Sequence, residues 1–172
     1  GLNSSCRFIR VWWWWTQTIK WLPFSKKHIE YILASKENKA NVAEGAVRAG
    51  KTIDNCIAFA LNLEYTKDKI HLASGSTLAN AKLNIGECNG YGLEYQFKGR
   101  CKWGKFKDNE ALFINTKTGQ KIVIFVGGGK ADSYKKILGN SYGLWIATEI
   151  NEHYDCDNSK ESFIKVAFAR QL

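Results

Sequence analysis

The feature that most constrains this chain is the run Gly45-Ala46-Val47-Arg48-Ala49-Gly50-Lys51-Thr52. It fits the pattern G-x-x-x-x-G-K-[ST] at every fixed position. The two glycines let the backbone wrap a phosphate, and the successive N–H groups point inward at the anion. We therefore predict that these eight residues bind the phosphates of a nucleotide. Lys51 would reach the β and γ phosphates, and the Thr52 hydroxyl would ligate Mg²⁺. A chance match in a glycine-containing turn is the alternative.

The segments on either side of this run fit a phosphate-binding loop. Residues 40–44 can form a short strand that enters the loop, and residues 53–65 have the pattern of a helix that leaves it. A helix that starts directly after the loop directs its positive end at the bound anion. The flanks therefore favour a P-loop nucleotide-binding fold.

Composition limits the remaining choices. A chain of 172 residues, 45% apolar and 24% charged, is typical of one globular domain. The net charge of +9 favours an anionic partner such as a nucleotide or nucleic acid. The five cysteines form no C-x-x-C pair, which indicates a reducing compartment, no metal cluster, and small buried or half-buried side chains. They are Cys6, Cys56, Cys88, Cys101 and Cys156.

We expect residues 1–21 to be an N-terminal extension and residues 22–172 to be one domain. The tryptophan run at 12–15 follows apolar residues, but the stretch is too short to span a bilayer. It could sit at a membrane interface or a protein contact, or the extension could have little structural role. Since the chain contains no methionine, we also expect it to be a fragment or a processed product.

A helix after Ser25 precedes the loop, with apolar residues Ile29, Ile32 and Leu33 at helical spacing. Many DNA-translocating ATPases place an adenine-recognising segment at this point, usually with a glutamine that binds the adenine edge. His28 is the nearest candidate for that role here. An ordinary surface histidine is the alternative.

Strands and helices alternate after the loop. Residues 69–75 read as a strand, and Ser76 or Thr77 then caps a helix that runs to about Cys88. Strands at 111–115 and 121–126 follow. This alternation predicts an α/β fold with a mainly parallel central sheet flanked by helices. The buried face expected for the helix comprises Leu78, Ala81, Leu83 and Ile85.

Two features flank the last of these strands. Residues 121–126 are nearly all apolar, which predicts burial on both faces of the sheet. The glycines 127–129 follow directly, where an α/β ATPase turns at the carboxyl edge of its sheet. Residues 130–138 then read as a short basic helix that Gly139 ends.

The segment 97–107 interleaves five basic residues with three aromatic ones. Such a pattern could track a phosphate backbone. A solvated, charged hairpin is the alternative.

A second nucleotide-site element is the apolar strand 142–148, which is followed by Glu149. An apolar strand that ends in an acidic residue about a hundred residues after a P-loop has the form of a Walker B segment. A carboxylate at that strand end can orient and polarise the attacking water, so we predict Glu149 as the general base. Glu149 beginning an ordinary loop is the alternative. Thr148 occupies the position where an aspartate usually holds Mg²⁺ through water, which predicts weaker metal binding.

These residues resemble the N-terminal ATPase part of the large terminase subunit of tailed bacteriophages and prophages, closest to the PBSX-like branch. The resemblance rests on 24–28, Glu44–Thr52, 125–128, and Leu138-Gly139 leading into 145–151. An arginine inside the loop is characteristic of that family, and the resemblance implies that Arg48 contacts the γ-phosphate in the transition state. A solvent-facing loop arginine is the alternative.

The resemblance implies a motor that couples Mg-ATP hydrolysis to packaging of double-stranded DNA into a procapsid, in the cytoplasm of a bacterial host. Implied partners are DNA, the small terminase subunit, the portal and other copies in a ring, with no membrane. Such terminases continue into a nuclease domain, so we expect a truncated motor that hydrolyses ATP slowly by itself. We also expect residues 161–172 to be a helix without a stop signal. The alternatives are another P-loop DNA-dependent ATPase, such as a helicase or RecA-like protein, and a nucleotide-binding fragment without turnover.

Overall fold

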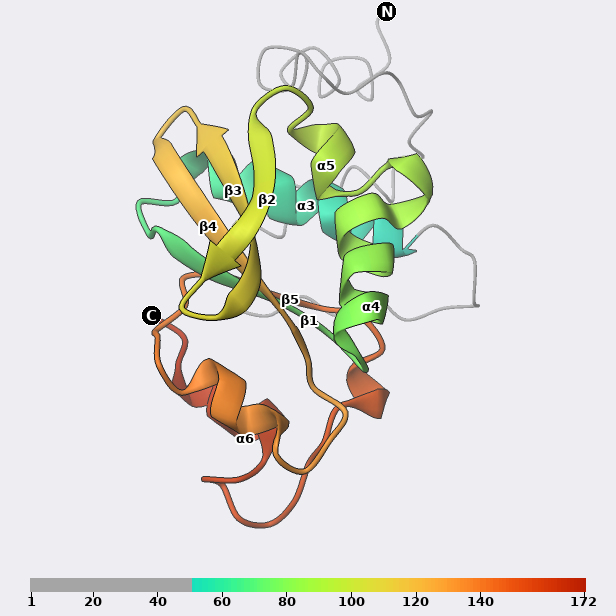
Figure 1. Cartoon of the computed structure of the whole chain (residues 1–172), viewed down its shortest axis with the longest axis vertical. Coiled ribbons are helices and arrows are strands. Elements are labelled where there is room, and N and C mark those ends of the chain that lie inside the picture. Colours follow the sequence, from blue (N-terminus) through green and yellow to red (C-terminus); the bar gives the residue numbers. More distant parts are fainter. Residues whose placement is uncertain (1–50) are drawn as a thin grey trace, which may run out of the picture.

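The computed structural model of the chain describes residues 51–172 (Figure 1). Several predicted features lie outside the described residues. They are the extension 1–21, the helix with His28, the strand 40–44 and the loop 45–50 with Arg48. The first described element is helix α3, Lys51–Tyr65, which confirms the helix predicted after the loop. The side chains of Lys51 and Thr52 also lie outside the description.

A five-stranded sheet with the order β2-β3-β4-β1-β5 forms the centre of the fold. The strands are β1 (Ile70–Gly75), β2 (Cys101–Phe106), β3 (Asn109–Thr116), β4 (Gly119–Gly127) and β5 (Trp145–Ala147). β1 pairs in parallel with both β4 and β5, whereas β3 pairs antiparallel with both β2 and β4. The α/β class is confirmed, but the prediction of a mainly parallel sheet is wrong because the sheet is mixed.

Two tight hairpins explain the antiparallel half of the sheet. Phe106 pairs with Asn109 around a two-residue turn in which Lys107 and Asp108 have φ of 48° and 65°. Both values are left-handed, as in the type I′ turns that match the twist of paired strands. Thr116 likewise pairs with Gly119. Since a two-residue connection reverses the chain, adjacent strands joined in this way must run antiparallel.

Side chains that alternate along the strands build a core on each face of the sheet. Val123 and Phe125 pack with α3, with α4 (Leu78–Ala81) and with α5 (Leu93–Gln96). Ile122 and Ile124 face the other side, with α6 (Phe163–Ala169). In Figure 1, α3, α4 and α5 lie on the upper side of the molecule and α6 lies below. Residues 121–127 are all buried, as predicted for a strand covered on both faces.

The helix predicted after β1 begins as expected and then widens. The Thr77 side chain accepts a hydrogen bond from Asn80 N and caps α4. From Lys82 to Glu87 the chain continues as a π-helix, η1, which ends at Cys88 in the left-handed conformation. Because the wider turns change the helical repeat, Leu83 is 54% exposed, so its predicted burial is wrong. Ala81 and Ile85 are buried as predicted.

The remaining elements are short. They are the 3₁₀ turns η2 (Cys88–Gly90), η3 (Ser133–Ile137) and η4 (Ile150–Glu152), together with α6. The basic helix predicted at 130–138 is therefore reduced to η3. The strand predicted at 142–148 is reduced to β5.

The prediction of a helix over 161–172 without a stop is wrong, because α6 ends at Ala169. Tyr142 N donates to Arg170 O, and Leu172 N donates to Tyr142 O. These two bonds form an isolated parallel β-bridge between Gln171 and Tyr142, which lies shortly before β5. Within residues 51–172, no helix combines the length and the apolar character needed to cross a membrane.

Candidate nucleotide site at the carboxyl edge of the sheet

The parallel strands β4, β1 and β5 end at one edge of the sheet, which we call the carboxyl edge. Ser76 follows β1, the glycines 128–129 follow β4, and Thr148 and Glu149 follow β5. Backbone bonds tie these ends together: Gly128 N donates to Gly75 O at 2.8 Å, and Thr148 N donates to Ser74 O at 2.9 Å. The glycine run therefore lies at the carboxyl edge, as predicted, and ligands of open α/β sheets bind at this edge.

Helix α3 runs back across the sheet, so that its two ends lie at opposite edges (Figure 1). Near its end, Glu64 Oε2 accepts from Lys117 N at 2.9 Å and Glu64 O accepts from Thr118 Oγ1 at 3.0 Å, in the turn that precedes β4. Fifteen helical residues span about 22 Å, which is longer than the six-residue strand β1. Ile53, in the first turn, packs in the same core as Ile146 of β5. The start of α3, where the predicted loop ends, is thus directed toward the carboxyl edge.

Glu149 is exposed at this edge and is held by two polar neighbours. Its Oε2 accepts a hydrogen bond from Ser76 Oγ at 2.8 Å. Asn80 Nδ2 donates to Ser76 Oγ at 2.7 Å and lies 3.5 Å from the same carboxylate oxygen. The backbone of Glu149 is left-handed, with φ 56° and ψ 49°, a conformation that is uncommon for residues other than glycine. The carboxylate is therefore aimed along the edge, toward the loop after β1.

Beneath Glu149 lies a buried polar chain that the sequence did not predict. Trp145 Nε1 donates to Ser74 Oγ at 2.8 Å, and Ser74 Oγ lies 2.8 Å from His153 Nε2. His153 Nδ1 lies 3.0 Å from Glu149 O. Ser74 is fully buried, and His153 is 5% exposed. The only available signal was the spacing of His153 four residues after Glu149, which does not by itself predict a contact.

The directions of the hydrogen bonds between Ser74, His153 and Glu149 are fixed. Glu149 O is a carbonyl and can only accept, so His153 Nδ1 carries a proton. Burial lowers the pKa of His153, against the opposing effects of the hydrogen bond to Glu149 O and the Glu149 charge. The ring is therefore neutral near pH 7, its Nε2 accepts, and the Ser74 hydroxyl donates to it.

The glycines of the carboxyl edge are required by close packing. A Cβ on Gly127 would lie 2.8 Å from Leu78 N, and one on Gly128 would lie 2.7 Å from His153 Cδ2 and 2.9 Å from the Phe163 ring. Neither glycine has a left-handed backbone, so the constraint is space rather than conformation.

The donor set suits a hard cation, though the metal role of Thr148 stays a prediction. The edge presents the Glu149 carboxylate with the Ser76 hydroxyl 2.8 Å from it, and Thr148 directly precedes Glu149 in sequence. Oxygen ligands of this kind are those that Mg²⁺ prefers. Among the described residues, no group of three or more histidine, cysteine or acidic side chains is placed to hold a metal ion. The four described cysteines are free and buried or half-buried, as predicted.

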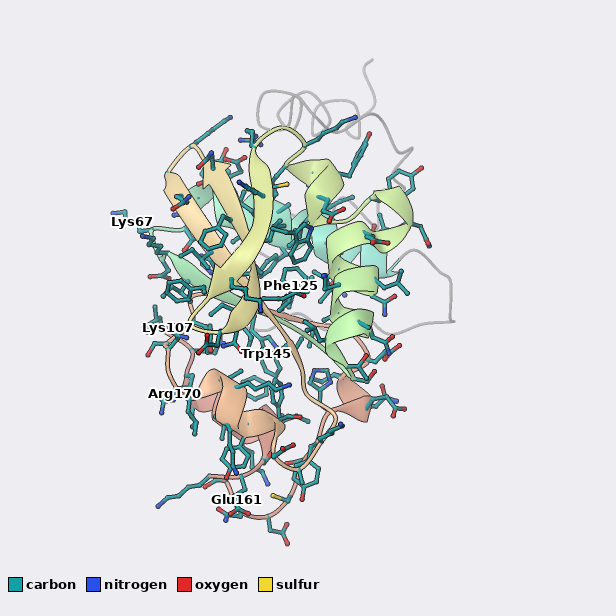
Figure 2. All side chains as sticks on the ribbon, viewed as in Figure 1. Lys67, Lys107, Phe125, Trp145, Glu161 and Arg170 are labelled. Atoms are coloured by element: carbon teal, nitrogen blue, oxygen red, sulfur yellow. The ribbon has the colours of Figure 1, made fainter. Side chains whose placement is uncertain are left out.

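The basic, aromatic segment 97–107 is a turn followed by edge strand β2, and its aromatic rings face the core. Phe97 is buried, and the Trp103 ring packs 4.8 Å from that of Phe125, which Figure 2 shows in the interior. Figure 2 shows Lys107, in contrast, at the rim of the molecule. The rings are thus not free to stack on bases, whereas most of the basic side chains remain exposed. These lysines can still contact phosphates, so the phosphate-backbone alternative survives in this reduced form.

Solved structures of a large terminase are similar to this one. The large terminase of a thermophilic bacteriophage matches with a TM-score of 0.66, 20% identity and coverage of 87% of this chain. The same terminase matches in complex with ADP (TM-score 0.67, 21% identity, 86% coverage) and with ATP-γ-S (0.61, 18%, 86%).

The matched parts are 36%, 36% and 35% of the terminase chains, so this chain spans little more than a third of their length. No family model and no curated protein matches. The resemblance to large terminases is thus confirmed at the level of the fold.

Proposed function

We propose that this chain is the ATPase motor part of a large terminase, which couples Mg-ATP hydrolysis to packaging of double-stranded DNA. Three findings support the proposal. The chain has the fold of part of a large terminase, and that terminase has been solved with ADP and with ATP-γ-S. The sequence contains a complete P-loop pattern, whose last two residues begin α3. Glu149 lies at the sheet edge toward which the start of α3 is directed.

In this proposal, residues 45–50 and Lys51 bind the phosphates, and His28 contacts the adenine. Arg48 stabilises the charge that develops on the γ-phosphate in the transition state. Thr52, and Thr148 through water, hold Mg²⁺, which neutralises phosphate charge when bound. Glu149 accepts a proton from the attacking water. Because Thr148 carries no charge, we expect weaker binding of Mg²⁺ than with an aspartate at this position.

The remaining partners of the proposal are those of large terminases. They are double-stranded DNA, the small terminase subunit, the portal of the procapsid and other copies in a ring, in the host cytoplasm. The exposed lysines of β2 are candidates for contacts with the DNA backbone, which would make binding fall steeply with salt concentration. Slow turnover by this chain alone is expected, because it spans little more than a third of the terminase chains that it matches. Brisk turnover that Lys51→Ala abolishes would contradict that expectation.

The observation that carries the proposal is the exposed Glu149 carboxylate, 2.8 Å from Ser76 Oγ at the edge where β1, β4 and β5 end. Its test compares Lys51→Ala with Glu149→Gln. We expect Lys51→Ala to lose binding of a fluorescent ATP analogue in the presence of Mg²⁺. Glu149→Gln should retain that binding and lose at least about 100-fold in phosphate release, the usual scale for a general base.

Three other outcomes are informative. If Glu149→Gln releases phosphate at the wild-type rate, Glu149 is not the base. If Lys51→Ala binds the analogue as well as the wild-type chain does, the phosphate-binding assignment fails. If the wild-type chain binds the analogue but releases no phosphate even with DNA present, it is a nucleotide-binding fragment without turnover, which is the second candidate function.

A further inference from the structure

The backbone of Glu149 is held in its unusual conformation by two hydrogen bonds to one carbonyl. Glu149 O accepts from Glu152 N at 2.8 Å and from His153 Nδ1 at 3.0 Å. A left-handed backbone is unfavourable for a residue with a Cβ, and it persists only where the surroundings enforce it. The first bond closes the turn η4 and is local. The second bond connects Glu149 to the buried interior.

His153 is itself held from several sides. Its Nε2 accepts from Ser74 Oγ, which lies on β1 between β4 and β5. Its ring packs 5.4 Å from that of Phe163 on α6 and 6.5 Å from that of Trp145 on β5. Tyr154 N, next along the chain, donates to Gly128 O at 2.7 Å. The imidazole therefore connects β1 and α6 to the peptide of the glutamate, and the next residue ties the same segment to the loop after β4.

The direction of the Glu149 side chain depends on this backbone conformation. With the observed φ and ψ, the carboxylate meets Ser76 Oγ, two residues beyond Ser74 on the same strand and loop. A right-handed or extended backbone at Glu149 would turn the side chain away from this hydroxyl, since φ and ψ set the direction of the Cα–Cβ bond relative to the chain. The Ser74–His153 pair thus fixes the glutamate peptide from inside, while Ser76 and Asn80 contact its carboxylate from outside.

We propose that His153, through Nδ1–H donated to Glu149 O, is the positioning residue for the general base. This inference rests on the proposed ATPase function, since positioning matters only if Glu149 acts on a water. His153 is not itself catalytic: it is 5% exposed and contacts the backbone of Glu149, not its carboxylate. Its loss should lower kcat while leaving nucleotide binding unchanged, because its described contacts are to β1, β5, α6 and the Glu149 peptide, and none is to α3.

The test uses two substitutions, each of which can reproduce the hydrogen bond of one ring nitrogen but not of the other. In His153→Asn the side-chain amide reaches about as far as Nδ1 and can donate to Glu149 O. In His153→Gln it reaches about as far as Nε2 and can bond only to Ser74. We expect His153→Asn to retain kcat within about threefold, and His153→Gln to lose about tenfold or more, since small misplacements of a reacting group cost up to about 100-fold. Both variants should bind the fluorescent ATP analogue as the wild-type chain does.

A melting curve of each variant keeps the comparison interpretable. If His153 has only a structural role, both variants should lose stability and share the same kcat for the folded fraction. Equal kcat values would therefore overturn the proposal. The ¹⁵N spectrum of the imidazole gives a readout that is independent of turnover. We expect the proton on Nδ1, and a proton on Nε2 alone would also overturn the proposal. If the wild-type chain shows no Lys51-dependent turnover, the proposed function itself fails, and the role of His153 fails with it.

Discussion

The charged side chains at the two edges of the sheet differ in burial and in the partners that they contact. At the edge where β1 and β4 begin, which we call the amino edge, Glu64 and Lys121 are each 2% exposed. Glu64 Oε1 lies 2.8 Å from Arg100 Nη2, and Lys121 Nζ donates to Thr66 O. At the carboxyl edge, Glu149 is exposed, and among the interactions described its carboxylate contacts only the neutral side chains of Ser76 and Asn80.

Among the described residues, the two buried histidines show the same contrast. His71, on β1, donates from Nε2 to Asp68 O at 2.8 Å and accepts at Nδ1 from Leu144 N at 3.0 Å, so both ring nitrogens bind backbone that carries no site residue. His153 binds the peptide of Glu149. A polar group whose partners are all internal contributes to stability, whereas one that supports an exposed carboxylate is placed to contribute to function. Substitutions at the two edges can test this distinction.

The largest expected effect is on stability at the amino edge. Glu64→Ala removes the partner of Arg100 and leaves Lys117 N without its acceptor. Breaking a buried pair costs about 3–5 kcal/mol, and we expect about 3 kcal/mol because the Arg100 side chain is 32% exposed. Urea denaturation measures this loss in the free energy of unfolding.

Glu110→Ala is the matched control. Glu110 pairs with Lys82 at 3.0 Å, and both side chains are about a third exposed (32% and 38%). An exposed pair of this kind contributes about 0–1 kcal/mol. Equal losses in the two variants would show that burial at the amino edge does not strengthen its ion pair.

A second prediction concerns acid. Burial lowers the pKa of His71 from 6.5 to about 4, with opposing effects from the hydrogen bond to Asp68 O. Because the folded-state pKa is depressed, the unfolded chain binds more protons between pH 6.5 and 4, so stability is present above pH 6.5 and is lost as the pH falls. Lowering the pH from 7 to 5 should remove about 2 kcal/mol of unfolding free energy through this residue.

His71→Gln tests that assignment, because glutamine cannot titrate but can still donate to Asp68 O. Unfolding free energies at pH 7 and pH 5 should differ by about 2 kcal/mol less in the variant than in the wild-type chain. Some acid loss will remain, since burial also lowers the pKa of His153. An unchanged difference would mean that His71 does not titrate in this range.

Much of the fold follows from hydrophobic pattern. The helix after the loop, β1, β3 and β4 were all predicted from period and apolar content, and Glu149 was predicted to follow a strand at the carboxyl edge. The antiparallel pairing of β2 with β3 was not predicted. It depends on a turn of Lys107 and Asp108, two residues other than glycine in a left-handed conformation, which composition does not reveal.

The neighbours of Glu149 could not be predicted for a different reason. Ser74 and Ser76 are more than seventy residues from Glu149 in sequence. Ser76 contacts Glu149, and Ser74 contacts the His153 ring behind it, only because β5 pairs with β1. His153 is near Glu149 in sequence, but its role depends on the left-handed turn that brings Nδ1 to a carbonyl four residues earlier. Sequence pattern identified the candidate reacting group, and only the tertiary pairing identifies what holds it.

The smallest expected effect on stability is at the carboxyl edge. Gly128→Ala would place a methyl group 2.7 Å from His153 Cδ2 and 2.9 Å from the Phe163 ring. Overpacking of this kind costs about 1–3 kcal/mol, and we expect about 1–2 kcal/mol because one of the two neighbours is a single ring edge. Gly139→Ala is the control, since no atom lies within 4 Å of its added Cβ and its φ is not positive. Thermal melting should show a loss of stability for Gly128→Ala and none for Gly139→Ala.

Since the new methyl group pushes on the imidazole that holds the Glu149 peptide, Gly128→Ala should also lower kcat more than its folded fraction explains. A loss of stability without that excess would place Gly128 with the structural groups of the amino edge.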